Sequence, residues 1–163
     1  MPIQPVISNT TPLIGLSGIN YLPLLRDLYT EVWIPREVEK EFLALDETVY
    51  QEVLNSAPWI KVIDLTNPQS AAIYQGIDDG EAEVFALAVE HDARLVLLDE
   101  NKGRKKGKEI GLTVKGTVGV LQEAKEEGLI DVIKPLLIQL RDNGIHLSKS
   151  LISDALQEAG ETD

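Results

Sequence analysis

Short apolar runs alternate with helix-like patterns along the first 130 residues of the chain. The run Leu95–Leu98 is apolar at every position, which is typical of a strand buried on both faces. The other runs are short or alternate between apolar and polar residues. The pattern predicts strands at 5–8, 31–34, 60–65, 95–98 and 112–114. It predicts helices beginning at Pro12 and Pro35, and helices at 21–29, 49–56, 81–91, 101–110 and 117–126.

Strands that alternate with helices at this spacing favour βαβ units, and therefore an α/β fold with a parallel sheet covered on both faces. We expect Ile7, Val32, Val62, Val96 and Val114 to lie in one sheet. The tail from 131 to 158 predicts two further helices, divided at Asn143-Gly144. We therefore expect a domain over 1–130 and a C-terminal helical extension over 131–163 that packs on the same domain.

Polar residues follow two of the predicted strands. Asn9 follows the first strand, and Asp99 and Glu100 follow Leu95–Leu98. Ligands of open α/β sheets bind outside the carboxyl ends of the strands, so we expect Asn9 and Asp99 to lie near each other at that edge. Glu81 stands at the start of a predicted helix, which places its carboxylate at the top of the side that faces the sheet.

Glu41 interrupts an apolar stripe on the helix that begins at Pro35. The stripe consists of Val38, Phe42 and Leu45. A carboxylate on a packing face costs several kcal/mol unless it is paired or binds a metal. We expect Glu41 to join the acids at the sheet edge in one acidic pocket, whose oxygen ligands suit Mg²⁺ or Mn²⁺ rather than zinc.

Each of these residues also has a purely structural interpretation. Glu81 fits a capping box with Asp78, and Asp99 fits the N-cap of the helix that follows it. Glu41 can lie at the edge of its stripe and reach solvent, and Asn9 is a good turn residue. The coincidence of several such groups at one edge of the sheet favours a functional site.

Charge is distributed unevenly along the chain. The 15 basic and 27 acidic residues give a net charge of −12, a poor balance for a protein that coats nucleic acid. One segment departs from this balance, since it carries five basic residues and no acid: Lys102, Arg104, Lys105, Lys106 and Lys108. The cluster predicts contact with a phosphate-bearing ligand, and the alternative is a solvated helix face. The segment lacks the length and the Ser/Thr of a P-loop.

Several other chemistries are excluded by what the sequence lacks. Without cysteine, there are no disulfides, thiolate zinc sites or cysteine nucleophiles. His91 and His146 have no metal-ligand spacing, and 5% aromatic residues are too few for a base-stacking platform. No signal peptide is recognisable and the apolar runs are too short to span a bilayer, so we expect a cytoplasmic protein.

Five short pieces of the chain together resemble the PIN domain family, in particular the prokaryotic subgroup DUF3368. Each piece is weak alone, but their order and spacing over residues 6–128 are specific. They are Ile7-Ser-Asn-Thr-Thr-Pro-Leu-Ile14, Ile34-Pro-Arg-Glu-Val38 leading to Glu41, Gly80-Glu81 with Ala86-Leu-Ala88, Leu98-Asp-Glu-Asn-Lys-Gly-Arg104, and Gly116-Thr-Val-Gly119.

The resemblance implies a three-layer α/β/α sandwich and an acidic Mg²⁺ or Mn²⁺ site that cleaves RNA. Such proteins often act as the toxin of a VapBC-type toxin–antitoxin pair. Glu41, Glu81 and Asp99 match three acidic positions of the family, and Asn9 stands where the first acid is usually Asp. The same comparison suggests accessory roles for three residues: Glu100, Thr10 and Thr117.

The expected function is therefore metal-dependent hydrolysis of RNA phosphodiesters, with the basic segment along the RNA backbone. The alternative, favoured by Asn9, is a catalytically silent PIN scaffold that binds RNA or a protein. A receiver-like phospho-acceptor, with Lys115 at a strand end, is a third interpretation, but it leaves Glu41 and Glu81 unexplained. An antitoxin and a second copy of the chain are the expected protein partners. The helices at 21–29 and 49–56 suggest the second copy, because their Tyr and Leu residues lack an obvious internal partner.

Overall fold

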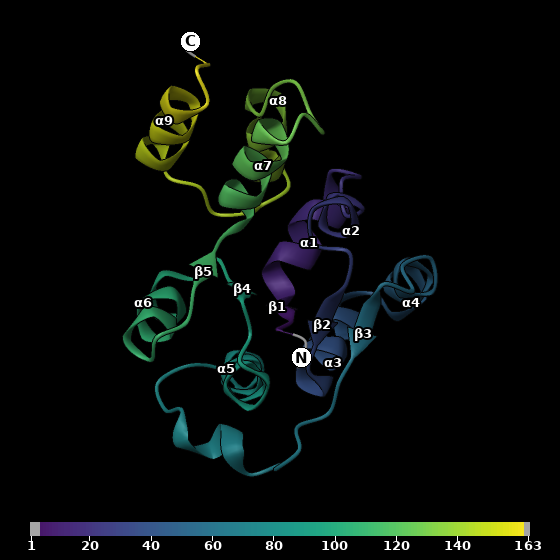
Figure 1. Cartoon of the computed structure of the whole chain (residues 1–163). Coiled ribbons are helices and arrows are strands. Elements are labelled where there is room, and N and C mark those ends of the chain that lie inside the picture. The colour runs from purple at the N-terminus through teal and green to yellow at the C-terminus, as the bar shows by residue number, and fades with distance from the viewer. Residues whose placement is uncertain (1–3, 162–163) are drawn as a thin grey trace.

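Five short parallel strands form the central sheet in the computed structural model, which describes residues 4–161 (Figure 1). The order is β3-β2-β1-β4-β5. In the central strand, Ile7 pairs with Trp33 of β2 on one side and with Val96 of β4 on the other. The strands are β1 (Val6–Ser8), β2 (Val32–Ile34), β3 (Ile60–Val62), β4 (Leu95–Leu97) and β5 (Val114–Lys115). The five residues predicted to share one sheet each lie in one of these strands, which confirms that prediction.

Helices cover both faces of the sheet, so the fold is the expected α/β/α sandwich (Figure 1). Before β4 the chain forms α1 (Thr10–Gly18), α2 (Leu24–Tyr29), α3 (Arg36–Leu45), α4 (Glu47–Asn55), the 3₁₀ turn η1 (Ser70–Ile73) and α5 (Asp79–His91). After β4 it forms α6 (Asn101–Glu109), α7 (Thr117–Glu126), α8 (Lys134–Asp142) and α9 (Lys149–Glu158). Helix α1 packs against α3, α7 and α8.

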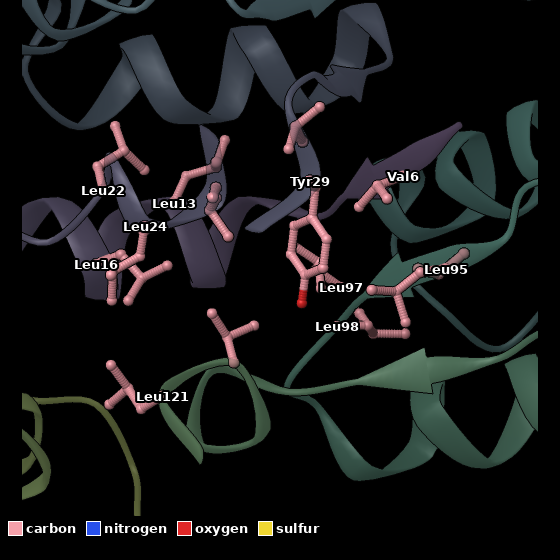
Figure 2. Close-up of a cluster of buried hydrophobic side chains, with 14 of the residues drawn as sticks. Val6, Leu13, Leu16, Leu22, Leu24, Tyr29, Leu95, Leu97, Leu98 and Leu121 are labelled. Atoms are coloured by element: carbon pink, nitrogen blue, oxygen red, sulfur yellow. The ribbon is translucent and has the colours of Figure 1, made fainter. Parts of the chain in front are cut away.

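The core is apolar and continuous from the sheet to the last helices. Leu13, Leu16 and Ile19 of the α1 region are buried, as their spacing predicts. Figure 2 shows Leu13 and Leu16 in one cluster with Leu95 and Leu97 of β4, with Leu98 directly after β4 and with Leu121 of α7. Leu137 of α8 and Leu156 of α9 belong to the same buried cluster. The C-terminal helices therefore share the core of the sheet.

The Glu161 carboxylate links the segment after α9 to the start of α8 and to α7. Glu161 accepts hydrogen bonds from the amides of Ile133 and Lys134 at 2.8 and 3.0 Å, where α8 begins. Its other contact is the Lys125 ammonium of α7 at 2.9 Å. Because the first amides of a helix lack intrahelical partners, this arrangement caps α8 with a residue from beyond α9.

Some predicted boundaries differ from the observed ones. Helix α1 begins at Thr10 rather than Pro12, because Asn9 already has the extended backbone of an N-cap. The third strand ends at Val62 rather than Leu65. After the Ile63 amide bonds to Ile34 O, the following amides of Thr66 and Asn67 bind the Glu90 carboxylate of α5 instead of another strand.

Two tyrosines that suggested an intermolecular surface have partners inside the protein. The Tyr50 ring lies 4.4 Å from the Phe42 ring. The buried Tyr29 hydroxyl donates to Glu123 Oε1 at 2.5 Å, and the Lys115 ammonium reaches the same oxygen at 2.8 Å. Tyr29 and Tyr50 therefore give no support to a dimer, whereas Tyr21 of the predicted helix at 21–29 is exposed, and the dimer stays a prediction.

Candidate functional site

The candidate site lies at the carboxyl edge of the sheet, where β1 and β4 end side by side. Ser8 pairs with Leu97 in the parallel ladder, and the Asn9 amide donates to Leu97 O at 2.9 Å. Asp99 follows β4 two residues later. The register therefore places Asn9 and Asp99 at the same edge, as the sequence predicts.

Asn9 is more than a turn residue. It precedes α1 with an extended backbone (φ −78°, ψ 176°) and is only 6% exposed. Its side chain makes no capping hydrogen bond, and its buried Oδ1 has no hydrogen-bond partner within residues 4–161. A buried oxygen of this kind costs about 1–3 kcal/mol. A turn alone does not account for that cost.

Glu41 of α3 is held by groups from α1 and α5. Thr10 Oγ1 donates to Glu41 Oε2 at 3.0 Å, and the Gly80 backbone donates a second hydrogen bond. A side chain on Gly80 would collide with Glu41 Oε1, so the glycine makes room for the carboxylate. Burial raises the Glu41 pKa, and the charges of Asp78 and Glu37 raise it further, whereas the two hydrogen bonds oppose the shift.

Glu81 lies in the first turn of α5 and is 5% exposed. Asp78 caps the helix by accepting from the Glu81 amide at 2.8 Å, which confirms the N-cap half of the predicted capping box. The carboxylate has a second feature: its Oε2 is buried without a partner in the described chain, against the first turn of α6. Burial raises the Glu81 pKa to about 8, with further contributions from the Asp78 hydrogen bond and the charges of Asp78, Glu100 and Glu41.

Asp99 is bound on both oxygens by one residue. The Thr117 amide donates to Asp99 Oδ1 at 2.7 Å, and Thr117 Oγ1 donates to Oδ2 at 2.6 Å. Burial raises the Asp99 pKa, while these hydrogen bonds and the nearby Arg104 charge hold it down. Asp99 does not cap α6, so that alternative is wrong. Glu100 does so, accepting from the amides of Lys102 and Gly103.

The structure thus divides the predicted acidic pocket into two groups. Asp78 raises the pKa of both Glu41 and Glu81, and Glu41 adds to the shift of Glu81, whereas Asp99 is paired with Thr117 and influenced by Arg104. Within residues 4–161, no three acidic or histidine side chains lie close enough to hold a metal ion by themselves. The kinds of donor nevertheless fit a hard cation, because two buried oxygens, Asn9 Oδ1 and Glu81 Oε2, have no partner among the residues that the structure describes.

Helix α6 carries the five clustered cations close to this edge. Lys102, Lys105 and Lys108 are exposed, and Arg104 and Lys106 are half-buried. None of the five forms an ion pair with a carboxylate in the part of the chain that the structure describes. Their charge is therefore available to an external anion.

Glycines allow α6 to approach the site, and the sequence interpretation missed them. A side chain on Gly103 would collide with Glu81 Oε2, and one on Gly107 would begin 2.9 Å from Val114 Cγ2. Glycine is unfavourable within a helix, so two glycines four residues apart are a signal of close packing that could have been recognised. Asp78 and Gly80 were missed as neighbours of Glu41, because their contacts depend on how α3 meets α5.

The family assignment agrees with this arrangement. A family model described as a PIN domain, DUF3368, matches residues 5–161. The chain belongs to the PIN domain family. This PIN domain includes the C-terminal helices, since the match extends beyond α9. A search of the curated proteins finds no match.

Membership in the PIN domain family explains the parallel sheet and indicates which kinds of ligand such a site binds. PIN domains have a nuclease-type fold, generally use divalent metal ions and commonly bind RNA or antitoxins. The receiver-like interpretation is therefore not retained, and Lys115, on which it depended, is paired with Glu123. Within residues 4–161 of this PIN domain, no helix is long and apolar enough to cross a bilayer.

Proposed function

We propose that this PIN domain is a Mg²⁺- or Mn²⁺-dependent ribonuclease that hydrolyses phosphodiester bonds. The observation that carries the proposal is two buried oxygens without a partner within residues 4–161: Asn9 Oδ1, directly after β1, and Glu81 Oε2, in the first turn of α5. Buried polar atoms almost always have partners, and exceptions point to a bound ion or water. Oxygen donors favour hard divalent cations.

The four residues that would hold the ion are Asn9, Glu41, Glu81 and Asp99. When bound, a divalent ion activates water and stabilises charge on the attacked phosphate. The protein's own groups prepare the ligands. Thr10 fixes one oxygen of Glu41, and Thr117 fixes both oxygens of Asp99. Glu100 is the N-cap of α6, and its charge helps to raise the Glu81 pKa.

The unpaired cations of α6 support RNA as the substrate. A chain with net charge −12 repels a polyanion unless its basic groups are gathered where the anion binds. Lys102, Arg104, Lys105, Lys106 and Lys108 provide that concentration at the site, and single-stranded backbones are bound through such positively charged surfaces.

The test is a cleavage assay on unstructured and hairpin RNA with Mg²⁺, with Mn²⁺ and with a chelator. We expect slow cleavage with metal and none with chelator. Glu81→Gln removes a carboxylate from the site and should abolish cleavage, whereas Glu126→Gln, an exposed acid on α7, should behave like the wild type. Metal-independent cleavage, or equal activity of Glu81→Gln, contradicts the proposal.

A silent scaffold remains the second candidate, because an amide stands at Asn9 and the acids are divided into two groups. In that case RNA or a protein binds without cleavage under every metal condition. Binding of RNA by the wild type with no product, together with metal binding by calorimetry, would favour this function over the ribonuclease.

A toxin role follows from the same proposal. We expect expression of the wild type to arrest bacterial growth and Glu81→Gln to relieve the arrest. An antitoxin would be recognised as the protein that restores growth when co-expressed. A homodimer is expected in light scattering at micromolar concentration, and a monomeric mass would contradict it.

A further inference from the structure

A groove of about 870 Å³ lies at the end of α1 that is farther from the candidate site. Helix α1 begins directly after Asn9 and ends at Gly18, which lines the groove. A rise of 1.5 Å per residue places about 12 Å between these two ends of the helix. The other walls are residues 19–21, residues 129–132 between α7 and α8, and one side of α8 and its C-cap, from Pro135 to Asn143. The groove therefore runs along α8, away from the strand ends.

Three large apolar side chains are exposed on the walls of this groove. They are Tyr21, Leu129 and Val132, which come from two segments far apart in the sequence. Single exposed apolar residues are common on protein surfaces, but several that line one hollow indicate a surface that another molecule covers. Small ligands are usually held in pockets that bury most of their surface, whereas these walls are exposed along the groove. The shape therefore favours a segment of polypeptide.

The charged side chains of the groove are all negative. Asp131 and Asp142 carry the full charges among the described residues that line it, and no lysine or arginine is among them. Neither carboxylate forms an ion pair within residues 4–161. Helices α1 and α8 both end at the groove, where Asn143 Nδ2 donates to Gly18 O at 3.3 Å, and the carbonyl end of a helix carries a partial negative charge. The groove therefore favours a cationic side chain.

A second copy of the chain does not supply both kinds of side chain. Two chains with a net charge of −12 repel each other. The basic cluster of another copy lies on α6, which consists of asparagine, lysine, glycine, arginine and glutamate alone. That helix offers positive charge, but it has no apolar side chain to cover Tyr21, Leu129 and Val132.

We propose that this groove is the docking surface for a segment of another protein in which basic and apolar side chains alternate. The length of the groove along α8, about 12 Å, accommodates about four residues of extended chain. The apolar side chains of the segment cover the three exposed apolar residues, and its lysine or arginine side chains pair with Asp131 and Asp142. Because the candidate site lies at the other end of α1, the segment binds without contacting a ligand there, whether or not the chain cleaves RNA.

The test measures binding of a fluorescent eight-residue peptide of alternating arginine and leucine to the whole protein by anisotropy. One control peptide replaces leucine with serine and keeps the charge, and the other replaces arginine with aspartate and keeps the apolar side chains. We expect the first peptide to bind and each control to bind at least about tenfold more weakly, because the groove requires both features.

The charges of the groove are tested by combining Asp131→Asn with Asp142→Asn. We expect this double variant to weaken binding of the arginine–leucine peptide about tenfold. The matched control combines Glu47→Gln with Glu52→Gln, two exposed acids of α4, and should stay within about twofold of the wild type. Both double variants lose the same net charge, so a general attraction between the acidic protein and the peptide would affect them equally.

The apolar wall is tested by Val132→Ser, with Val89→Ser of α5 as the matched control. The two valines are 48% and 56% exposed, so neither substitution leaves a cavity in the core. We expect Val132→Ser to weaken binding about fivefold and Val89→Ser to leave it unchanged. Melting curves confirm that each variant is folded.

Equal weakening by the two double variants, or no binding of the arginine–leucine peptide to the wild type, overturns the docking surface. Weaker binding to Glu81→Gln, or in the presence of Mn²⁺, would place the peptide at the acidic site instead and overturns it as well. If the wild type is a dimer in light scattering that Val132→Ser dissociates and Val89→Ser does not, the groove is covered by a second copy and the proposal is wrong.

Discussion

At the sheet edge, the negative charges of the two groups of acids are offset in different ways. Asp99 accepts two short hydrogen bonds from Thr117 and has a cation nearby. Glu81 is surrounded by the carboxylates of Asp78, Glu100 and Glu41 and leaves one buried oxygen unpartnered. Burial still raises the Asp99 pKa, so the protein compensates the charge of Asp99 in part, whereas within the described chain Glu81 is compensated only when a proton or an external cation arrives.

This difference in compensation suggests that the two groups of acids have different roles at the sheet edge. A pre-compensated carboxylate keeps its position whether or not a ligand is bound, since its hydrogen bonds fix its orientation. An uncompensated group binds cations more strongly, because binding removes an existing cost. We infer that the Glu41–Glu81 side determines affinity for the metal and that the Asp99 side determines the placement of what the metal acts on.

The largest expected effect is the pH dependence caused by Glu81. Its pKa of about 8 in the folded protein lies above the ordinary value of 4.5, so between these values the native state holds a proton that the unfolded state has lost. Stability from this group is therefore present at low pH and falls as pH rises toward 8, by at most about 1.4 kcal/mol per pH unit.

Chemical denaturation of the wild type and Glu81→Gln from pH 5 to pH 9 in chelator isolates this contribution. Glu81→Gln should gain stability relative to the wild type as pH rises, and the difference should level off above pH 8. A difference that does not change with pH would show that neither burial nor the surrounding acids raise the Glu81 pKa.

A smaller effect is expected from Gly103→Ala, which tests how closely α6 covers Glu81. The new methyl group meets Glu81 Oε2 and lies 3.0 Å from Leu98 Cδ2. Overpacking of this kind costs about 1–3 kcal/mol, and the better helix propensity of alanine offsets up to about 1 kcal/mol of it. Combining the change with Glu81→Ala should restore much of the loss in a double-mutant cycle, and simple additivity would argue against the contact.

Asp99→Asn should cost about 1–2 kcal/mol in the absence of metal. The amide oxygen can accept from the Thr117 amide and the amide NH2 can donate to the Thr117 hydroxyl, so two charge-assisted hydrogen bonds become weaker neutral ones. Denaturation in chelator measures the loss, and Glu126→Gln is the control. If Asp99→Asn were instead as stable as the wild type, the two sides of the site would not differ in the way described.

The smallest expected change is that of Asn9→Asp. The added carboxylate lacks a hydrogen-bond partner, as the amide oxygen does now, and it stands at the same edge as Asp99. We expect a loss of about 1 kcal/mol in chelator and a larger rise in melting temperature with Mn²⁺ than the wild type shows. Equal responses to Mn²⁺ in the two proteins would place the ion away from Asn9. If Asn9→Asp binds metal but remains inactive on every RNA tested, the scaffold function is preferred.

The sequence was sufficient for the fold because each strand is marked by a local pattern. The apolar run at Leu95–Leu98 locates a buried strand, Pro35 marks the start of α3, and Pro12 lies within the first turn of α1, all without reference to the rest of the chain. Glu41 was recognised in the same way, since a carboxylate within an apolar stripe is visible in ten residues of sequence. These features are local, and local features predict well.

The division of the acidic residues into two groups could not be predicted from local sequence patterns. It depends on α6 lying against Glu81 through Gly103 and on α7 presenting Thr117 to Asp99, and both are contacts between elements distant in the sequence. The choice between Asp99 and Glu100 as the cap of α6 also depended on Thr117. Once Thr117 engages Asp99, the next carboxylate takes the cap.

The buried hydroxyl of Tyr29 gives the protein an internal optical probe. Burial, together with its hydrogen bond to Glu123, holds the Tyr29 pKa far above its usual range, and Tyr74 is shifted in the same direction by burial. The chain has four tyrosines, so an alkaline titration followed by tyrosinate absorbance should be incomplete while the chain is folded. The remaining absorbance should appear only as the structure opens, and its time course would record unfolding without any added dye.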